Sequence, residues 1–382
     1  MGDNARLPPN AGDWGKRAIA KKVDTLSLHS GDLASGSKVE EKQYLLFRVL
    51  WRIQKKRSEV WTQLNIGNYE KDAHAFLAGY ESWAHYHEGV SFNIDMANVR
   101  NSTMTLALEF QRQAAATPDG EVTSDVVFTG TPVAKRTRRQ LEAKMKAVQI
   151  KEPTTPTPQR LIGSVPEYPN DENEGSTPRP TPSPETPEIN TPGPPDIRKI
   201  LDYQTKDEQI VNTALIAFLT SLTLHSSLNV GWSLDRLQLK ARFEDSHFEA
   251  RTDGYLQDKG PNGKVRALIE VKAATRASKG KVIRMQEAAQ MVAWIKHYPE
   301  PDTRLNWPGR RFHVSQDRDR IYIIVAEYKK GYLDFLAGNE EQTAFMTMHE
   351  YGPWITGIKQ QMAELAPILV AIALRAAEDR TL

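Results

Sequence analysis

The residues with the clearest chemical potential are two carboxylates and a lysine, Asp253, Glu270 and Lys272. Asp253 ends a predicted strand, and the turn-forming run Gly-Pro-Asn-Gly follows at 260–263. Glu270 and Lys272 lie on the next apolar strand, at 265–273, and share one face of it because side chains alternate along a strand. A tight hairpin would therefore bring all three charged groups to one spot.

Such a group of side chains suits the hydrolysis of a phosphodiester. Two close carboxylates resist ionisation unless a cation lies between them. Mg²⁺ binds one or two carboxylates and keeps several waters, and a bound divalent ion polarises a phosphoryl oxygen and activates water. A nearby lysine can hold the attacking water and stabilise developing charge. We therefore expect Mg²⁺, or Mn²⁺, at Asp253 and Glu270, with Lys272 positioning the water.

A simpler explanation of the pattern is a solvated strand face with cross-strand ion pairs. The spacing Glu-x-Lys occurs four times, at 40–42, 142–144, 270–272 and 327–329, so the spacing alone indicates nothing. Only the occurrence at 270–272 also has a preceding Asp, a turn, an apolar strand and a following amphipathic helix. This combination favours a site over a solvated face.

The chain resembles the PD-(D/E)xK nuclease superfamily in the order of three features: Asp253, then the run Glu-Val-Lys at 270–272, then a helix that carries Gln286 and Gln290. The nuclease-like domains common in fungal genomes are most similar, because they share a Gly-Pro-Trp element, here at 352–354, ahead of a final helix. The resemblance covers about residues 200–382. Thr252 stands where many members have proline, a position that varies within the superfamily.

The resemblance implies a restriction-endonuclease-like core of order α-β-β-β-α-β, with a mixed central sheet flanked by helices. The order of elements predicted from residue periodicity is also that of an α/β fold. By resemblance, Asp253 and Glu270 would bind the metal, Lys272 would be the catalytic lysine, and Gln286 or Gln290 would lie beside the site. Glu208, on the first core helix, is the candidate for a further acidic metal ligand.

Four basic residues follow the predicted active strand in a segment expected to be a flexible loop: Arg276, Lys279, Lys281 and Arg284. Lys and Arg contacts to phosphates supply affinity for nucleic acid that does not depend on its sequence. We therefore expect these four residues to bind nucleic acid. The alternative is an ordinary solvated loop.

Composition divides the chain of 382 residues into four parts. Residues 1–38 are polar and are expected to be disordered. Residues 39–150 are expected to form a helical accessory region with a basic cluster at 135–139. The cluster is typical of a nuclear localisation signal or a nucleic-acid patch, of which we favour the first; the alternative is the solvated first turns of a helix. Residues 151–199 hold 13 of the 23 prolines and are expected to be a linker, and 200–382 would be the nuclease-like domain.

The whole-chain composition excludes several classes of protein. The absence of cysteine excludes disulfide frameworks and thiolate metal sites, and it suits an intracellular protein. No apolar run reaches transmembrane length, so no membrane partner is expected. The net charge of +2 gives no global indication of nucleic-acid binding, so local patches must supply it. Oligomeric state is not predicted.

These observations predict a metal-dependent nuclease of intracellular, nuclear location that acts on DNA rather than RNA. The alternative is a non-catalytic module that retains the fold and binds nucleic acid or protein. The complete set of Asp253, Glu270 and Lys272 favours the enzyme, because a binding module has no physical need for all three.

Overall fold

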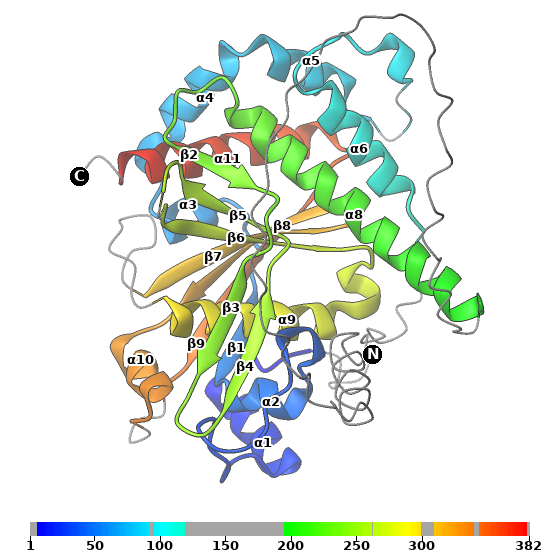
Figure 1. The fold of residues 1–382 in the computed structure, drawn as a ribbon. Helices are drawn as coiled ribbons and strands as arrows, with labels where there is room; N and C mark the ends of the chain where they lie inside the picture. Colours follow the sequence, from blue (N-terminus) through cyan, green and yellow to red (C-terminus); the bar gives the residue numbers. More distant parts are fainter. Residues whose placement is uncertain are drawn as a thin grey trace, which may run out of the picture. The chain divides into compact units, whose positions relative to one another are not determined.

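The computed structural model describes residues 6–118, 195–298, 309–339 and 344–379, except 92, 94 and 262. In the helix that begins at Pro195, side chains are described from Glu208 onward. These residues form a mixed seven-stranded sheet with helices on both faces (Figure 1). The predicted class, α/β with a mixed central sheet flanked by helices, is confirmed.

The strands of this sheet lie in the order β1-β9-β8-β7-β6-β5-β2. The pairs β1–β9 and β6–β7 are parallel, and the other neighbours are antiparallel. The central strands β6, β7 and β8 are buried on both faces, although most side chains of β7 are polar. The strands are β1 (Val49–Ile53), β2 (Val230–Ser233), β5 (Gly254–Asp258), β6 (Val265–Lys272), β7 (Arg310–Asp317), β8 (Arg320–Glu327) and β9 (Met346–Ile355).

The sheet has two separate hydrophobic cores, one on each face. On β8, Ile321 and Ile323 pack into the first core, and Tyr322 and Ile324 into the second. The first core is covered by α3 (Glu59–Gln63), α4 (Glu70–Ala78), α5 (Glu81–Gly89), α6 (Thr105–Ala116), α8 (Pro195–Thr223) and α11 (Lys359–Glu378).

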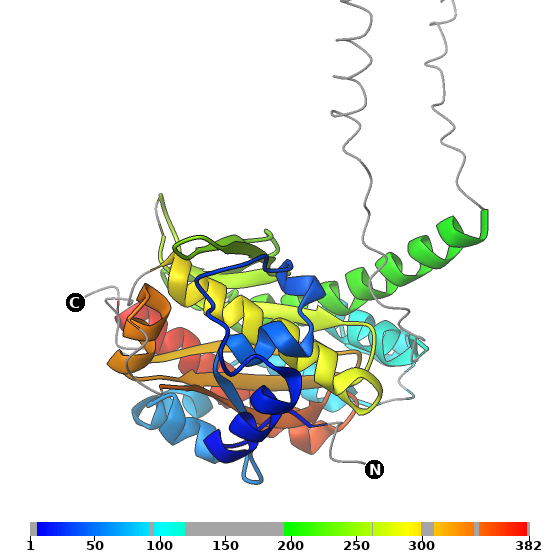
Figure 2. The same ribbon diagram turned by 90° about the horizontal axis from the view of Figure 1, so that it is seen from below.

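The second core lies under four helices and a small two-stranded hairpin (Figure 2). These elements are α1 (Ala11–Lys21), α2 (Glu41–Leu46), α9 (Arg276–His297), α10 (Lys330–Ala337), β3 (Gln238–Arg242) and β4 (His247–Arg251). The two long helices nearest β6 are therefore on opposite faces of the sheet, α8 on one and α9 on the other.

The N-terminal segment differs from the expectation of disorder at 1–38. Residues 11–21 form α1, whose N-cap Asn10 accepts the backbone N–H of Asp13 at 2.9 Å. The buried residues Leu7, Ala18 and Leu28 are widely spaced, so they give little periodicity, yet all three pack into the second core. Tertiary burial, which the local pattern does not show, orders this segment.

The helical region expected over 39–150 also contains a strand, because residues 49–53 form the edge strand β1, parallel to β9. A short apolar run cannot be assigned to helix or strand by periodicity alone. The Gly-Pro-Trp element at 352–354 lies within the strand β9, ahead of the final helix. Residues 6–118 and the described residues from 199 onward belong to one compact unit. The basic cluster at 135–139 and almost all of the predicted linker lie outside the described residues.

Candidate active site

The β5–β6 hairpin places Asp253 beside the end of β6. The Asp253 carboxylate accepts the backbone N–H of Val271 at 3.1 Å, and its own N–H donates to the carbonyl of Ile269 at 3.0 Å. The next residue, Gly254, lies so close to the Ser233 carbonyl that a Cβ would approach the oxygen to 2.5 Å. Only glycine fits at this crossing, so the backbone contact that positions Asp253 depends on the Asp-Gly pair.

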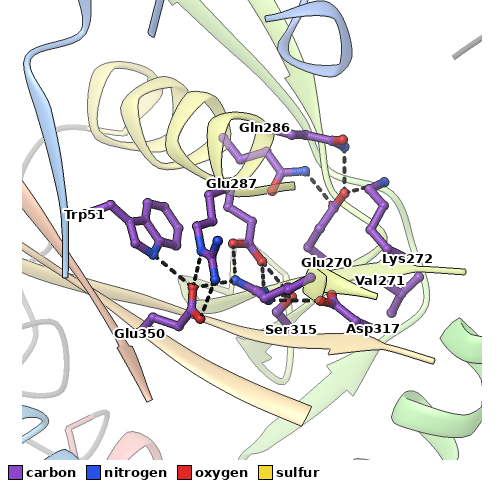
Figure 3. Close-up of polar contacts among 12 residues, drawn as sticks. Trp51, Glu270, Val271, Lys272, Gln286, Glu287, Ser315, Asp317 and Glu350 are labelled. Carbon is purple, nitrogen blue, oxygen red and sulfur yellow. Dashed lines mark hydrogen bonds and ion pairs between the residues drawn. The ribbon is translucent and has the colours of Figure 1, made fainter. Parts of the chain in front are cut away.

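Glu270 lies at the centre of the site and is only 1 % exposed. Its Oε1 accepts a hydrogen bond from Gln286 at 2.6 Å and pairs with Lys272 Nζ at 2.9 Å, while its Oε2 accepts from Gln290 at 2.5 Å (Figure 3). Gln286 and Gln290 are one turn apart on α9 and so share a face of that helix. The structure therefore brings both predicted helix glutamines to the predicted carboxylate.

Lys272 connects the two faces of the sheet. Besides Glu270, its ammonium lies 3.7 Å from Glu208 on α8. Burial opposes the charge of Lys272, but Glu270, Glu208 and Asp253 outweigh it and hold the pKa of the ammonium well above its usual range. Lys272 is therefore a fixed positive charge and not a proton acceptor at neutral pH.

The two carboxylates influence each other across the hairpin. Burial raises the pKa of Glu270; Lys272 opposes that rise, and the nearby charge of Asp253 adds to it. This is the electrostatic situation in which a divalent cation between the two carboxylates is stabilising. The donor set of two carboxylates fits a hard ion that keeps several waters, such as Mg²⁺.

The third predicted ligand, Glu208, is not arranged as one. It pairs with Lys272, and over the ranges that the structure describes no three His, Cys, Asp or Glu side chains are grouped to hold a metal ion. A helical position facing the site was correctly chosen, but a cation lies between Glu208 and the other carboxylates. Asp253 and Glu270 remain the residues that could hold a metal.

Two further residues contact Asp253 and were not predicted. Asn212 on α8 donates to its carbonyl oxygen at 3.0 Å, and the guanidinium of Arg236 lies 3.4 Å from its carboxylate. Arg236 is 64 % exposed and precedes β3, so it is available to a ligand at the site. Neither residue carries a sequence signal, because each reaches Asp253 from another element.

The prediction of a flexible basic loop after β6 is wrong. Residues 276–297 form α9, with non-helical backbone angles at Lys279, and the first basic residue, Arg276, is buried. Lys281 pairs with Glu41 at 3.0 Å and Arg284 with Glu350 at 2.7 Å. Arg276 cannot contact a phosphate without leaving its buried partners, and the other three are half-buried on a helix rather than extended on a loop.

Arg276 belongs to a buried ion cluster whose carboxylates, Glu287, Asp317 and Glu350, are labelled in Figure 3. Its guanidinium pairs with Glu287 at 2.5 Å, with Asp317 at 2.9 Å and with Glu350 at 3.0 Å. Burial opposes the charge of Glu350, but Arg276 and Arg284 outweigh it and lower its pKa to about 2. Burial raises the pKa of Asp317 to about 7 against the opposing charge of Arg276. Glu287 follows Gln286 directly, so this cluster anchors the helix that holds Glu270.

Comparisons with known families and curated proteins assign no family or function to the chain. A search with models of known families found no match, and a search of curated proteins found none either. No helix of the described residues is long and apolar enough to cross a membrane. The functional argument therefore depends on the geometry around Asp253, Glu270 and Lys272.

Proposed function

We propose that the chain is a metal-dependent nuclease that hydrolyses phosphodiester bonds in DNA, with a site similar to that of the PD-(D/E)xK superfamily. One observation carries the proposal: Asp253, Glu270 and Lys272 converge at the end of β6, with Gln286 and Gln290 on the same carboxylate. The other Glu-x-Lys pair at the end of a strand, Glu327 and Lys329, has no such partners: Glu327 contacts Gln63, Arg310 and His349.

The order of elements around the site supports a restriction-endonuclease-like core. α8 is followed, after β2 and the separate β3–β4 hairpin, by the antiparallel hairpin β5–β6 and then by α9, which returns the chain to β7, parallel to β6. β8 then pairs antiparallel to β7. The proposed core lies within a larger sheet, because β2 and β1–β9 extend it at the two edges.

Each side chain has a distinct part in the proposed reaction. Asp253 and Glu270 would hold Mg²⁺ or Mn²⁺, which when bound supplies polarisation of the phosphoryl oxygen. Lys272, kept protonated by its carboxylate neighbours, would position the attacking water and stabilise the charge that develops. Gln286 and Gln290 would fix the orientation of the Glu270 carboxylate, which has little freedom in its buried position.

The exposed face of the β3–β4 hairpin offers a contact surface for DNA in place of the predicted loop. Leu239 and Phe248 point into the second core, and the opposite face carries three exposed basic residues, Lys240, Arg242 and Arg251. Glu249 lies on the same face and pairs with Arg251 at 2.8 Å. This face leads directly to the site, because β4 ends two residues before Asp253. Such a basic ribbon would supply phosphate contacts that are independent of sequence.

One observation favours the non-catalytic alternative. Both oxygens of Glu270 already accept hydrogen bonds from side chains, and the carboxylate is almost fully buried. In a binding module the same contacts would serve only to stabilise the hairpin and α9. Catalysis requires that at least one of these contacts give way to the metal.

The deciding experiment compares cleavage of plasmid, linear and single-stranded DNA by the wild type and three variants, Asp253→Asn, Glu270→Gln and Lys272→Ala, with Mg²⁺ or Mn²⁺. Because residues that act as a unit are strongly non-additive, each single change should remove most activity. Glu327→Gln is the matched control on the neighbouring Glu-x-Lys pair and should cleave normally. Equal residual activity in all proteins would identify a contaminant and refute the enzyme.

The predicted nuclear location stays a proposal, since the basic cluster at 135–139 lies outside the described residues. A fluorescent fusion with and without that cluster measures its effect. Unchanged nuclear exclusion or entry in both fusions would show that the cluster is not a localisation signal.

A further inference from the structure

A hollow lies on the far side of α9 from the candidate active site, between the N-terminal segment, the end of β1 and Arg284. Its volume is about 710 Å³, within the range typical of pockets for small molecules. None of the proposed catalytic residues lines it. We call it the cationic hollow; the residues used below are Arg6, Asp13, Lys16, Arg17, Arg52 and Arg284.

The lining of the cationic hollow has five basic residues and one acidic residue. Two of the basic residues are paired with carboxylates outside the lining, Arg17 with Glu41 and Arg284 with Glu350. Over the described residues, no carboxylate forms an ion pair with Arg6, Lys16 or Arg52. The single acidic side chain, Asp13, accepts a hydrogen bond from Asn10 at 2.9 Å as part of the N-cap of α1. Like charges gathered in one concave site repel each other, so an anion in the hollow would be stabilised.

The walls of the hollow are fixed by contacts far apart in sequence. The carbonyl of Pro8 accepts the backbone N–H of Trp51 at 2.9 Å, and that of Pro9 accepts Arg52 Nε at 3.1 Å. The indole of Trp51 donates to Glu350 at 2.9 Å, which ties the floor to the buried ion cluster. The segment before α1 is thereby held against the edge strand, and the hollow is pre-formed.

We propose that the cationic hollow binds a small, phosphate-rich molecule of the nucleoside triphosphate or inorganic polyphosphate class. Arginine presents a planar set of donors that matches phosphate oxygens in pairs, and the lining offers several. The charge excess requires a ligand with several negative charges, and the concave shape favours a compact one over an extended backbone. The apolar side chains of Leu7, Pro9 and Ile53 beside the cations suit the flat part of a nucleotide.

The experiment is titration calorimetry of the full chain in the presence of a chelator, with tripolyphosphate and ATP as probes and a 12-nucleotide single strand as comparison. Lys16→Gln and Arg52→Gln remove charge from exposed side chains, so both variants should fold. Lys330→Gln is the control, since Lys330 is exposed on α10 and pairs only locally with Asp334. Both probes should bind the wild type and the control alike, and about tenfold more weakly to each of the two variants.

Absence of binding by either probe, or equal weakening in the control, would overturn the proposal. It would also be overturned if only the single strand bound and Lys16→Gln or Arg52→Gln reduced that binding, because the hollow would then be a nucleic-acid surface. The readout is binding without divalent metal. A failure of the proposed nuclease activity therefore leaves this result unaffected.

Discussion

Replacing Lys272 by Met is the sharpest test of the site, because Lys272 is the only cation in contact with Glu270 among the described residues. The pair is close, at 2.9 Å, and the side chains are 17 % and 1 % exposed. Removing one partner of a buried ion pair costs about 3–5 kcal/mol. Met retains most of the apolar stem of lysine, and Glu270 can take up a proton. We therefore expect the free energy of unfolding to fall by about 3 kcal/mol at pH 8.

The pH dependence of this loss has a definite sign. Without Lys272, the folded pKa of Glu270 rises further above its unfolded value, because burial already raises it and the opposing charge is gone. A group with a raised folded pKa contributes stability at low pH that is lost as the pH increases. The difference between Lys272→Met and the wild type should therefore be small near pH 5 and grow toward pH 8.

The assay is urea unfolding followed by circular dichroism at pH 5 and pH 8 in a chelator, beside cleavage rates with Mg²⁺. Lys296→Met is the matched control, because Lys296 is a half-buried lysine on α9 that donates to the carbonyl of Leu336 at 2.8 Å and has no carboxylate partner among the described residues. The Lys296→Met variant should keep cleavage, and the difference between its free energy of unfolding and that of the wild type should depend little on pH. Equal stability of Lys272→Met and the wild type at pH 8, or equal losses in both lysine variants, would refute the assigned geometry.

Three further outcomes are expected. Between pH 5.5 and 8.5 the free energy of unfolding of the wild type should fall by about 2 kcal/mol more than that of Asp317→Asn. The folded pKa of Asp317 is about 7, above its unfolded value, so the stability that its protonated form gives is lost as the pH rises. The same pH dependence of urea unfolding in both proteins would contradict this. A chain lacking residues 1–53 should unfold or associate, because deletion of β1 exposes the edge of β9 and opens the second core; a cooperative monomer by light scattering and thermal melting would show that the fold does not need α1 and β1. On acidification, the cleavage rate should begin to decline at a pH above the pKa of an ordinary glutamate, because burial raises the pKa of Glu270. A cleavage rate that stays unchanged down to pH 4.5 would exclude Glu270 as an ionised ligand.

The candidate site could be predicted from sequence because its geometry is local. Alternation on β6 puts Glu270 and Lys272 on one face, and the turn at 260–263 fixes the partner strand, so that Asp253 faces them. Helical spacing puts Gln286 and Gln290 on one face of α9, and the short connection from β6 turns that face toward Glu270. Each step uses contacts fewer than about twenty residues apart, for which period and turn type decide the outcome.

The edge strand β1 could not be predicted in this way. Its partner β9 lies about 300 residues later in the chain, and nothing within Val49–Ile53 distinguishes it from a buried helical turn. The same is true of α1, whose stability comes from burying Leu7 and Ala18 against residues distant in sequence. Local patterns underestimate such segments because their order depends on tertiary packing.

The basic segment at 276–284 could not be predicted for a different reason. Its charges are evident in the sequence, but the burial of Arg276 and its ion-pair partners are not. Lys and Arg are rarely buried unless paired, so four of them in sequence indicate a solvated loop. Arg276 is buried because Glu287, Asp317 and Glu350 surround it, and two of these three come from other strands. The cluster has a structural consequence for the site: Arg276 and Glu287 join the start of α9 to its middle, while the adjacent Gln286 holds Glu270. Basic residues predicted to bind the substrate instead fix the helix that orients the proposed metal ligand.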